Sequence, residues 1–199
     1  MAKIQPGATL TPHFRDFLPA WVAQQPWYPG DRVPSLSPVG YFRFEDPAGE
    51  VGIETHLVTD GSVLYQIPMT YRGAPLAGAD QALITTAEHS VLGTRWIYDG
   101  EKDPIWAGEV LRLIGTEGGS ESSSRRGGGE AQARGRRLTQ GELTSSAVTI
   151  ELRRILTAGD PPSDPEIIGL MMGTWYPGGP DAATATGCLA TIRSRRHSS

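Results

Sequence analysis

Two stretches of the chain repeat apolar residues at helical spacing. The first carries large side chains at the i, i+3, i+4, i+7 and i+8 positions of an amphipathic helix: Phe14, Phe17, Leu18, Trp21 and Val22. Thr11-Pro12 is a typical helix start, and we expect Pro19 to restart this helix and Pro26 to end it. Asp103-Pro104 predicts the start of a second helix, with the same spacing in Trp106, Val110, Leu113 and Ile114.

Elsewhere the apolar residues follow the pattern of β-strands. Before the second helix we expect five strands, at 41–45, 51–59, 63–71, 82–88 and 94–98. Asp60-Gly61 is a strong hairpin signal between two of them. After the second helix three more strands are expected, at 148–155, 167–175 and 187–193, separated by turns rich in proline and glycine.

Residues 115–146 differ from the rest of the chain in composition. This segment contains 8 Gly and 6 Ser in 32 residues, and Leu138 and Leu143 are its only large apolar side chains. Such a segment buries too little surface to offset the entropy lost when its backbone is ordered. We therefore predict a disordered linker here.

The three strands after the linker would bury little apolar surface by themselves. We expect them to join the front sheet while the linker loops out. The predicted fold class is α+β, a mostly antiparallel sheet packed by one or two helices. Residues 1–114 then form the front part, 147–193 the C-terminal strands of the same sheet, and 194–199 a tail.

Composition excludes several classes of protein. The chain has 199 residues, and 18 basic against 22 acidic side chains give a net charge of -4, which does not favour nucleic-acid binding. Its single cysteine, Cys188, excludes a disulfide framework. No run of about 18 apolar residues is present to cross a membrane, and the N-terminus has no signal-peptide pattern. These observations predict a cytoplasmic protein with no membrane partner.

The residues that phosphoryl transfer requires are not found in the sequence. Neither Lys3 nor Lys102 lies in a phosphate-binding loop, and the chain has no asparagine to hold magnesium in a kinase-like site. Glu54 and His56 share one face of a predicted strand, but no third ligand marks a metal site. We therefore expect no catalytic residue, no metal and no cofactor. The arginines of the linker have no aromatic neighbours to stack on bases, so we do not expect a nucleic-acid partner.

The chain is rich in large aromatic rings for its size: Trp21, Trp27, Tyr28, Trp96, Tyr98, Trp106, Trp175 and Tyr176. Core packing is the favoured interpretation for the set, because each ring buries a large apolar area. Trp27 and Tyr28 lie between a proline and the Pro29-Gly30-Asp31-Arg32 turn. The alternative for these two is partial exposure, with contacts to a partner.

Three segments in series are similar to the N-terminal cap domain of actinobacterial maltokinases. The first is LPAWVAQQPWYPGDR at 18–32, with Pro26 where arginine is usual in that family. The second is YQIPMTYR at 65–72, and the third runs from the Tyr-Asp-Gly at 98–100 through Asp103-Pro104 to Leu111–Ile114. The resemblance covers residues 15–114.

The resemblance implies a cystatin-like cap, in which a curved antiparallel sheet packs against a helix. In that family the cap is fused to a kinase module that phosphorylates maltose with ATP and magnesium, in the service of glycogen or α-glucan synthesis. None of the module's catalytic residues maps onto this sequence. We therefore expect a standalone cap-like protein that is not itself an enzyme.

The same resemblance implies an accessory or regulatory role in maltose, trehalose or glycogen metabolism. The expected partner is a protein, either a kinase or an α-glucan enzyme. Candidate contact residues are Trp27, Tyr28, Asp31, Arg32 and Arg72. Two alternatives stay open: a sugar-binding module or maltokinase-related phosphotransferase component, and a structural domain whose linker does the binding.

Overall fold

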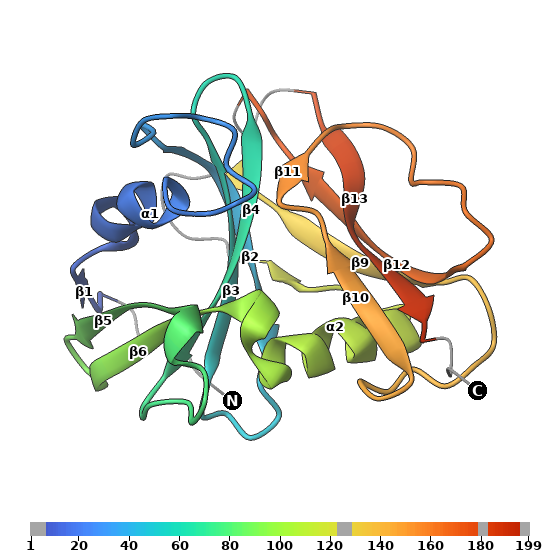
Figure 1. Ribbon diagram of the computed structural model, residues 1–199, viewed down its shortest axis with the longest axis horizontal. Helices are drawn as coiled ribbons and strands as arrows, with labels where there is room; N and C mark the ends of the chain where they lie inside the picture. The colour runs from blue at the N-terminus through green and yellow to red at the C-terminus, as the bar shows by residue number, and fades with distance from the viewer. Residues whose placement is uncertain (1–6, 123–128, 179–182, 196–199) are drawn as a thin grey trace.

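The computed structural model of the chain describes residues 7–122, 129–178 and 183–195, and its strands form two separate sheets (Figure 1). The strands of the first sheet are β1 (Leu10–Thr11), β2 (Ser37–Glu45), β3 (Gly52–Thr59), β4 (Leu64–Arg72), β5 (Leu83–His89), β6 (Gly93–Asp99), β7 (Glu121–Ser122), β8 (Gly129–Glu130) and β11 (Ile155–Leu156). They run in the order β1-β5-β6-β4-β3-β2-β7, while β8 pairs with β2 and β11 pairs with β4. All of these pairings are antiparallel except that of β8.

The second sheet has the order β10-β13-β12-β9 and is antiparallel throughout. Its strands are β9 (Gln132–Arg137), β10 (Val148–Leu152), β12 (Ile167–Trp175) and β13 (Ala185–Ser194). Two short 3-10 helices, η1 (Asp80–Ala82) and η2 (Gly100–Lys102), connect elements of the first sheet and the second α-helix. The predicted α+β fold with a curved, mostly antiparallel sheet is confirmed.

Each α-helix covers a different side of the first sheet. The helix α1 (Phe14–Val22) packs on one face, where Leu18 and Val22 contact Tyr65, Ile67 and other buried residues of the sheet. The helix α2 (Pro104–Gly115) lies toward the second sheet (Figure 1). No helix among the described residues is long and apolar enough to cross a membrane.

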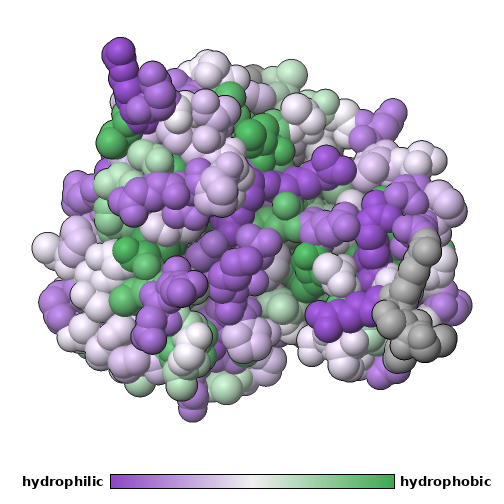
Figure 2. Space-filling view, in the orientation of Figure 1, coloured by the Kyte–Doolittle hydropathy of each residue, from purple (hydrophilic) through white to green (hydrophobic). Residues whose placement is uncertain are grey.

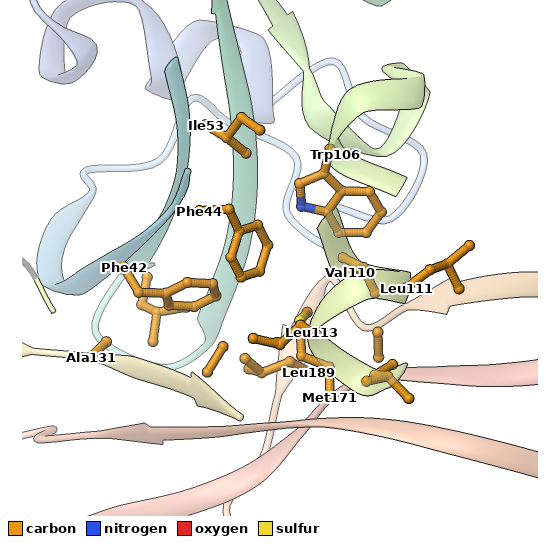
Figure 3. Packing of buried hydrophobic residues seen from close by; sticks show 14 of the residues in the cluster. Phe42, Phe44, Ile53, Trp106, Val110, Leu111, Leu113, Ala131, Met171 and Leu189 are labelled. Atoms are coloured by element: carbon orange, nitrogen blue, oxygen red, sulfur yellow. The ribbon is translucent and has the colours of Figure 1, made fainter. Parts of the chain in front are cut away.

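The larger core lies between the two sheets and includes α2. Phe42, Phe44 and Ile53 of the first sheet face Trp106 and Val110 of the helix (Figure 3). On the other side, residues of the second sheet complete the cluster, among them Met171, Leu189, Ala190 and Ile192. The two sheets therefore share one hydrophobic core.

The two helices were predicted with different success. The second begins as expected, because the Asp103 side chain caps the backbone N–H of Ile105 and Pro104 takes the first helical position. The first begins at Phe14, two residues later than the Pro12 start that was expected. His13 and Asp16 form a capping box there, whereas Thr11 belongs to β1. Pro19 lies inside one continuous helix rather than restarting it, and the helix ends at Val22, before Pro26.

The prediction of a disordered linker over 115–146 is wrong where the chain forms strands, at β7, β8 and the longer β9; residues 123–128 lie outside the described part of the chain. Amino-acid composition does not predict β9, because the side chains that it buries are very small. Ala133 and Gly135 alternate with exposed arginines, and a Cβ on Gly135 would collide with the backbone of Leu113. Glycine lets the strand backbone lie directly on α2, so little apolar side-chain surface is required.

The expectation that the C-terminal strands join the front sheet is also wrong, apart from β11. The predicted strand at 148–155 divides into β10, in the second sheet, and β11, which pairs with β4 through Ile155↔Tyr65 and Leu156↔Leu64. Three strands alone would form a sheet of marginal stability, because nothing would bury their apolar face. In the structure β9 supplies a fourth strand and α2 covers the inner face, so a separate sheet is stable.

Candidate functional site

Trp27 and Tyr28 lie just after α1, at the margin of the core between that helix and the first sheet. The Trp27 ring centroid is 5.9 Å from those of Trp21 and Tyr65, and the Tyr28 centroid is also 5.9 Å from that of Tyr65. Both side chains are half-buried. The structure therefore combines the two alternatives, because these rings pack on the core and still reach the surface.

The loop that follows is held in one conformation by its own contacts. The Tyr28 hydroxyl donates a hydrogen bond to the backbone oxygen of Arg32, 2.8 Å away. Gly30 passes so close to the Tyr28 ring that a Cβ there would collide with it. Asp31 and Arg32 are exposed, and Val33 is 63% exposed. The loop thus presents an acid, a base and an aliphatic side chain to solvent.

The Tyr65 ring lies beneath the rings of Trp27 and Tyr28 and is held in place by a hydrogen bond. Its hydroxyl donates a 2.7 Å hydrogen bond to Asp60 Oδ2. Burial and this bond raise the pKa of Tyr65 well above its usual value. Burial alone would raise the pKa of Asp60, but hydrogen bonds from Tyr65 and from residues of the adjacent turn outweigh burial and lower it. Tyr65 therefore stays protonated and Asp60 charged throughout the neutral pH range.

A buried arginine, Arg154, links Trp27 to β6 and η2. Arg154 lies between β10 and β11, and its Nη2 donates to Asp99 at 2.6 and 2.7 Å and to Glu101 at 2.6 Å. Its guanidinium carbon is 5.3 Å from the centroid of the Trp27 ring. The Arg154 Nε and Nη1 atoms have no hydrogen-bond partner among the described residues. No pattern in the sequence indicates a role for Arg154, because its partners come from segments more than 50 residues away.

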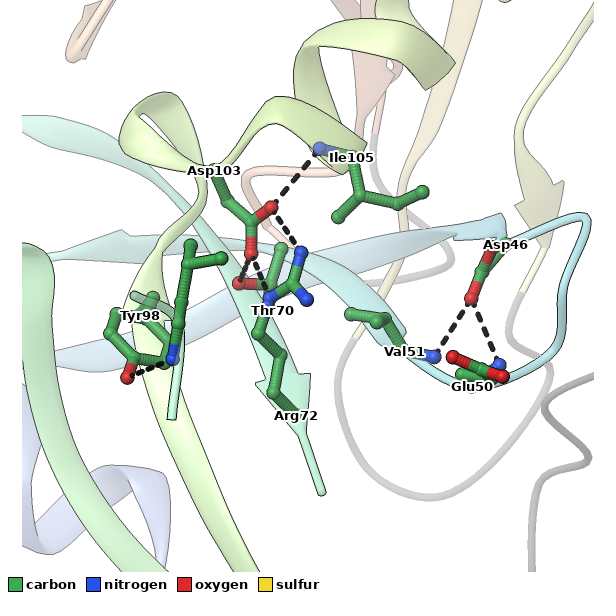
Figure 4. Close-up of polar contacts among 9 residues, drawn as sticks. Asp46, Glu50, Val51, Thr70, Arg72, Tyr98, Asp103 and Ile105 are labelled. Atoms are coloured by element: carbon green, nitrogen blue, oxygen red, sulfur yellow. Dashed lines mark hydrogen bonds and ion pairs between the residues drawn. The ribbon is translucent and has the colours of Figure 1, made fainter. Parts of the chain in front are cut away.

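Arg72, the fifth candidate, does not lie with the other four. Tyr65 and Arg72 are seven positions apart on β4, which corresponds to roughly 23 Å along the strand. The Arg72 guanidinium donates two 2.7 Å hydrogen bonds to Asp103, which also accepts from Thr70 (Figure 4). Arg72 therefore braces the start of α2, and we remove it from the candidate surface.

These bonds also set the charge of Asp103. Burial alone would raise the pKa of its carboxyl group, but hydrogen bonds from Arg72, Thr70 and the Ile105 N–H outweigh burial and lower it. The carboxylate is fully buried, whereas the Arg72 side chain is 20% exposed. Asp103 is thus held as an anion that caps α2 and binds β4 at once.

The Glu54–His56 pair belongs to a network across three strands. Glu54 lies 3.3 Å from Arg43 Nε and 3.4 Å from His56 Nε2, and it also bonds the Tyr71 hydroxyl. Burial opposes ionisation of Glu54, but these partners outweigh it and lower its pKa. The Phe14 ring covers His56 at 4.5 Å between centroids. Such mutual pairing accounts for the cluster as a structural element of the sheet.

A pocket of about 410 Å³ lies at the end of β2. Its lining combines both charges and comes from three parts of the chain: Arg43, Phe44, Glu45, Asp46, Pro47, Arg112, Gly119, Ser120 and Glu121. Asp46 already accepts hydrogen bonds from the N–H groups of Ala48, Glu50 and Val51, the last two shown in Figure 4. Arg112 binds Glu109 at 2.7 Å. These charges are used within the chain, so the pocket does not define a ligand.

Within residues 7–122, 129–178 and 183–195, no group of three or more His, Cys, Asp or Glu side chains is arranged to hold a metal ion. Figure 2 shows hydrophobic residues on one face of the molecule as small separate groups among hydrophilic ones. Contact surfaces on that face are therefore small and mixed.

The comparisons with known proteins agree with the resemblance found in the sequence. Residues 21–103 match the family described as the maltokinase N-terminal cap domain. This span includes residues 27–33, which we call the Trp27 loop, together with β2 to β6 and Asp103. No curated protein matches the chain. Residues 21–103, less than half of the chain, are thus similar to the maltokinase N-terminal cap domain.

Proposed function

We propose that this chain is a non-catalytic accessory module that binds a protein partner, either a kinase or an enzyme of maltose, trehalose or α-glucan metabolism. The match to a maltokinase cap over residues 21–103 is the observation that carries the proposal. A cap domain is by its description a companion of a kinase. The absence of asparagine and of a phosphate-binding lysine motif from the sequence supports a role without catalysis.

The contact surface in this proposal is the loop that follows α1. Trp27 and Tyr28 anchor it, and Asp31, Arg32 and Val33 are its exposed side chains. The Tyr28–Arg32 hydrogen bond fixes the loop before binding, so less entropy is lost when a partner docks. A fixed loop with one acid, one base and one aliphatic group suits a small and specific interface.

The test is to measure binding of the purified chain to the maltokinase-like kinase and the α-glucan enzymes of its own organism. Arg32→Glu and Val33→Asp change only exposed side chains, because Tyr28 bonds the backbone of Arg32 rather than its guanidinium. We expect each to weaken the complex at least about tenfold while the melting temperature stays unchanged. Lys102→Glu, at an exposed site on η2, is the matched charge-reversal control.

Two results would contradict the proposal. One is a complex whose affinity neither loop variant alters. The other is formation of maltose 1-phosphate when the chain alone is incubated with maltose, ATP and magnesium. The second result would favour the alternative of a phosphotransferase component.

A further inference from the structure

Three of the four outer edges of the two sheets are partly covered by short segments of the chain. β1 pairs with the edge of β5, while β7 and β8 pair with the edge of β2. Residues 118–120 cover β9, where the Ser120 N–H donates to the Ala133 oxygen and the Gly135 N–H donates to the Gly118 oxygen. The fourth edge is β10, which pairs with β13 alone among the described strands.

The hydrogen bonds that flank β10 show which backbone groups face outward. The Arg153 N–H donates to the Leu189 oxygen at 2.9 Å, and the Arg195 N–H donates to the Ala147 oxygen at 2.8 Å. In an antiparallel ladder every second residue then directs both its N–H and C=O at β13, which leaves the groups of Ile150 and Leu152 on the far side. No described residue of the chain bonds these four groups.

The first residue of the strand is protected, unlike Ile150 and Leu152. The Val148 N–H donates to the Thr144 oxygen at 3.1 Å, and the Val148 oxygen accepts from Arg195 Nε at 2.9 Å. The open part of the edge therefore consists of two donors and two acceptors in register. This is the pattern that an added strand pairs with.

Most of the usual obstacles to strand addition are missing from β10, and its one charged side chain is that of Glu151. The strand reads VTIEL, without proline or lysine, and its pairing with β13 has no bulge. Ile150 and Leu152 are half-buried at the margin of the main core. On the opposite face Glu151 is 51% exposed and accepts hydrogen bonds from Thr191 and Arg193.

We propose that β10 is a docking edge that binds an extended segment of a partner protein by strand addition. The segment places apolar side chains beside Ile150 and Leu152 and a basic side chain beside Glu151. This surface is separate from the Trp27 loop, and the proposal does not depend on the metabolic role of the chain. The partner is a protein with an exposed strand-forming segment of alternating apolar and basic residues.

Charge argues against a second copy of this chain as the occupant. A symmetric antiparallel pair that uses all four free groups pairs Ile150 with Leu152 of the other copy. That register sets the two Glu151 side chains directly opposite each other, and like charges in that position destabilise a sheet. A heterologous segment has no such constraint.

Backbone hydrogen exchange, measured residue by residue by NMR, tests the proposal. In the free chain the amides of Ile150 and Leu152 should exchange much faster than those of Thr149 and Glu151. The probe is a peptide of alternating lysine and valine, and its glutamate–valine counterpart is the control. We expect about 1 mM of the lysine peptide to slow exchange at Ile150 and Leu152 about tenfold, a dissociation constant of roughly 0.1 mM. The glutamate peptide should have no effect.

Two variants at one position separate edge pairing from general stability. Ile150→Pro removes the isoleucine side chain and an outward N–H, whose loss edge strands tolerate, and it should abolish protection at Leu152. Ile150→Ala loses the same side chain but keeps the N–H, and it should still bind the peptide. Glu151→Lys should reverse the preference between the two peptides.

Three outcomes would overturn the proposal. The first is no protection at Ile150 and Leu152 by either peptide. The second is equal loss of binding in Ile150→Pro and Ile150→Ala. The third is protection that grows with the concentration of the chain alone, which would make a second copy the occupant.

Discussion

The helix α2 contacts the two sheets in opposite ways. Toward the first sheet it packs large side chains against large side chains, with Trp106 facing Phe44 (Figure 3). Toward the second sheet it also lies directly against glycines of β9 and β12. A Cβ on Gly135 would fall on the Leu113 carbonyl, and a Cβ on Gly169 would meet Ile114 Cγ2 at 2.7 Å. The first contact depends on side-chain volume and the second on its absence, so one helix shows two separate ways of building a core.

The glycine contact is the more sensitive of the two. Gly135→Ala should lower the free energy of unfolding by about 3 kcal/mol, because the obstructing atoms are backbone and cannot rotate away. Urea denaturation followed by tryptophan fluorescence measures this change. A stability equal to that of the parent would mean that β9 does not lie against α2.

The ion pairs of Arg154 connect the segment between β10 and β11 to β6 and η2. Arg154→Met should cost about 3 kcal/mol, since it leaves the buried Asp99 without its cation. Arg153→Met changes the exposed neighbouring arginine and should cost far less. Equal effects of the two substitutions in urea denaturation would exclude a special role for the buried guanidinium.

Arg72 fastens α2 to the first sheet only, and its effect should be smaller and dependent on pH. We expect Arg72→Met to cost about 2 kcal/mol at pH 7, where Asp103 loses charge-assisted bonds. The folded pKa of Asp103 lies below its usual value of 3.8, so its contribution is present above that pH and is lost as the pH falls through the folded pKa. Denaturation of parent and variant from pH 7 to pH 2 should show the two stabilities converging in acid. A constant difference would contradict this account.

An exposed glycine of α2 gives the smallest effect, with the opposite sign. A Cβ on Gly108 would meet no other atom within 4 Å. Gly108→Ala should therefore raise the free energy of unfolding by about 0.5–1 kcal/mol through helix propensity. The melting temperature measured by circular dichroism should rise, and a fall would mean that this position is not on the free side of the helix.

The two sides of α2 also explain how far the sequence could be interpreted. Both helices and the strands before α2 were predictable because large apolar residues repeat at a clear period in them. β9 was not, since Ala133 and Gly135 carry no such signal and the exposed arginines between them suggest a solvated segment. The separate second sheet was missed for the same reason. Without β9 its other three strands would form a sheet of only marginal stability, so they were expected to join the first sheet.

Only those candidate residues that are neighbours in sequence lie together in the structure. Trp27, Tyr28, Asp31 and Arg32 share one loop, and the resemblance to the cap family identified it. Arg72 was grouped with them because no pattern in the sequence shows that it turns to Asp103. Arg154 was missed because its role arises only when distant segments meet.

The path of the chain has a consequence for any attempt to isolate the range 21–103 that matches the cap family. The backbone passes from one sheet to the other between β8 and β9, between β10 and β11, and again between β11 and β12. A fragment that stops at residue 103 would expose Phe42, Phe44 and Ile53 to water, because α2 and the second sheet would be missing. The range that matches the family is thus shorter than the unit that folds. A recombinant fragment cut at residue 103 should aggregate, so it could not be used to measure binding.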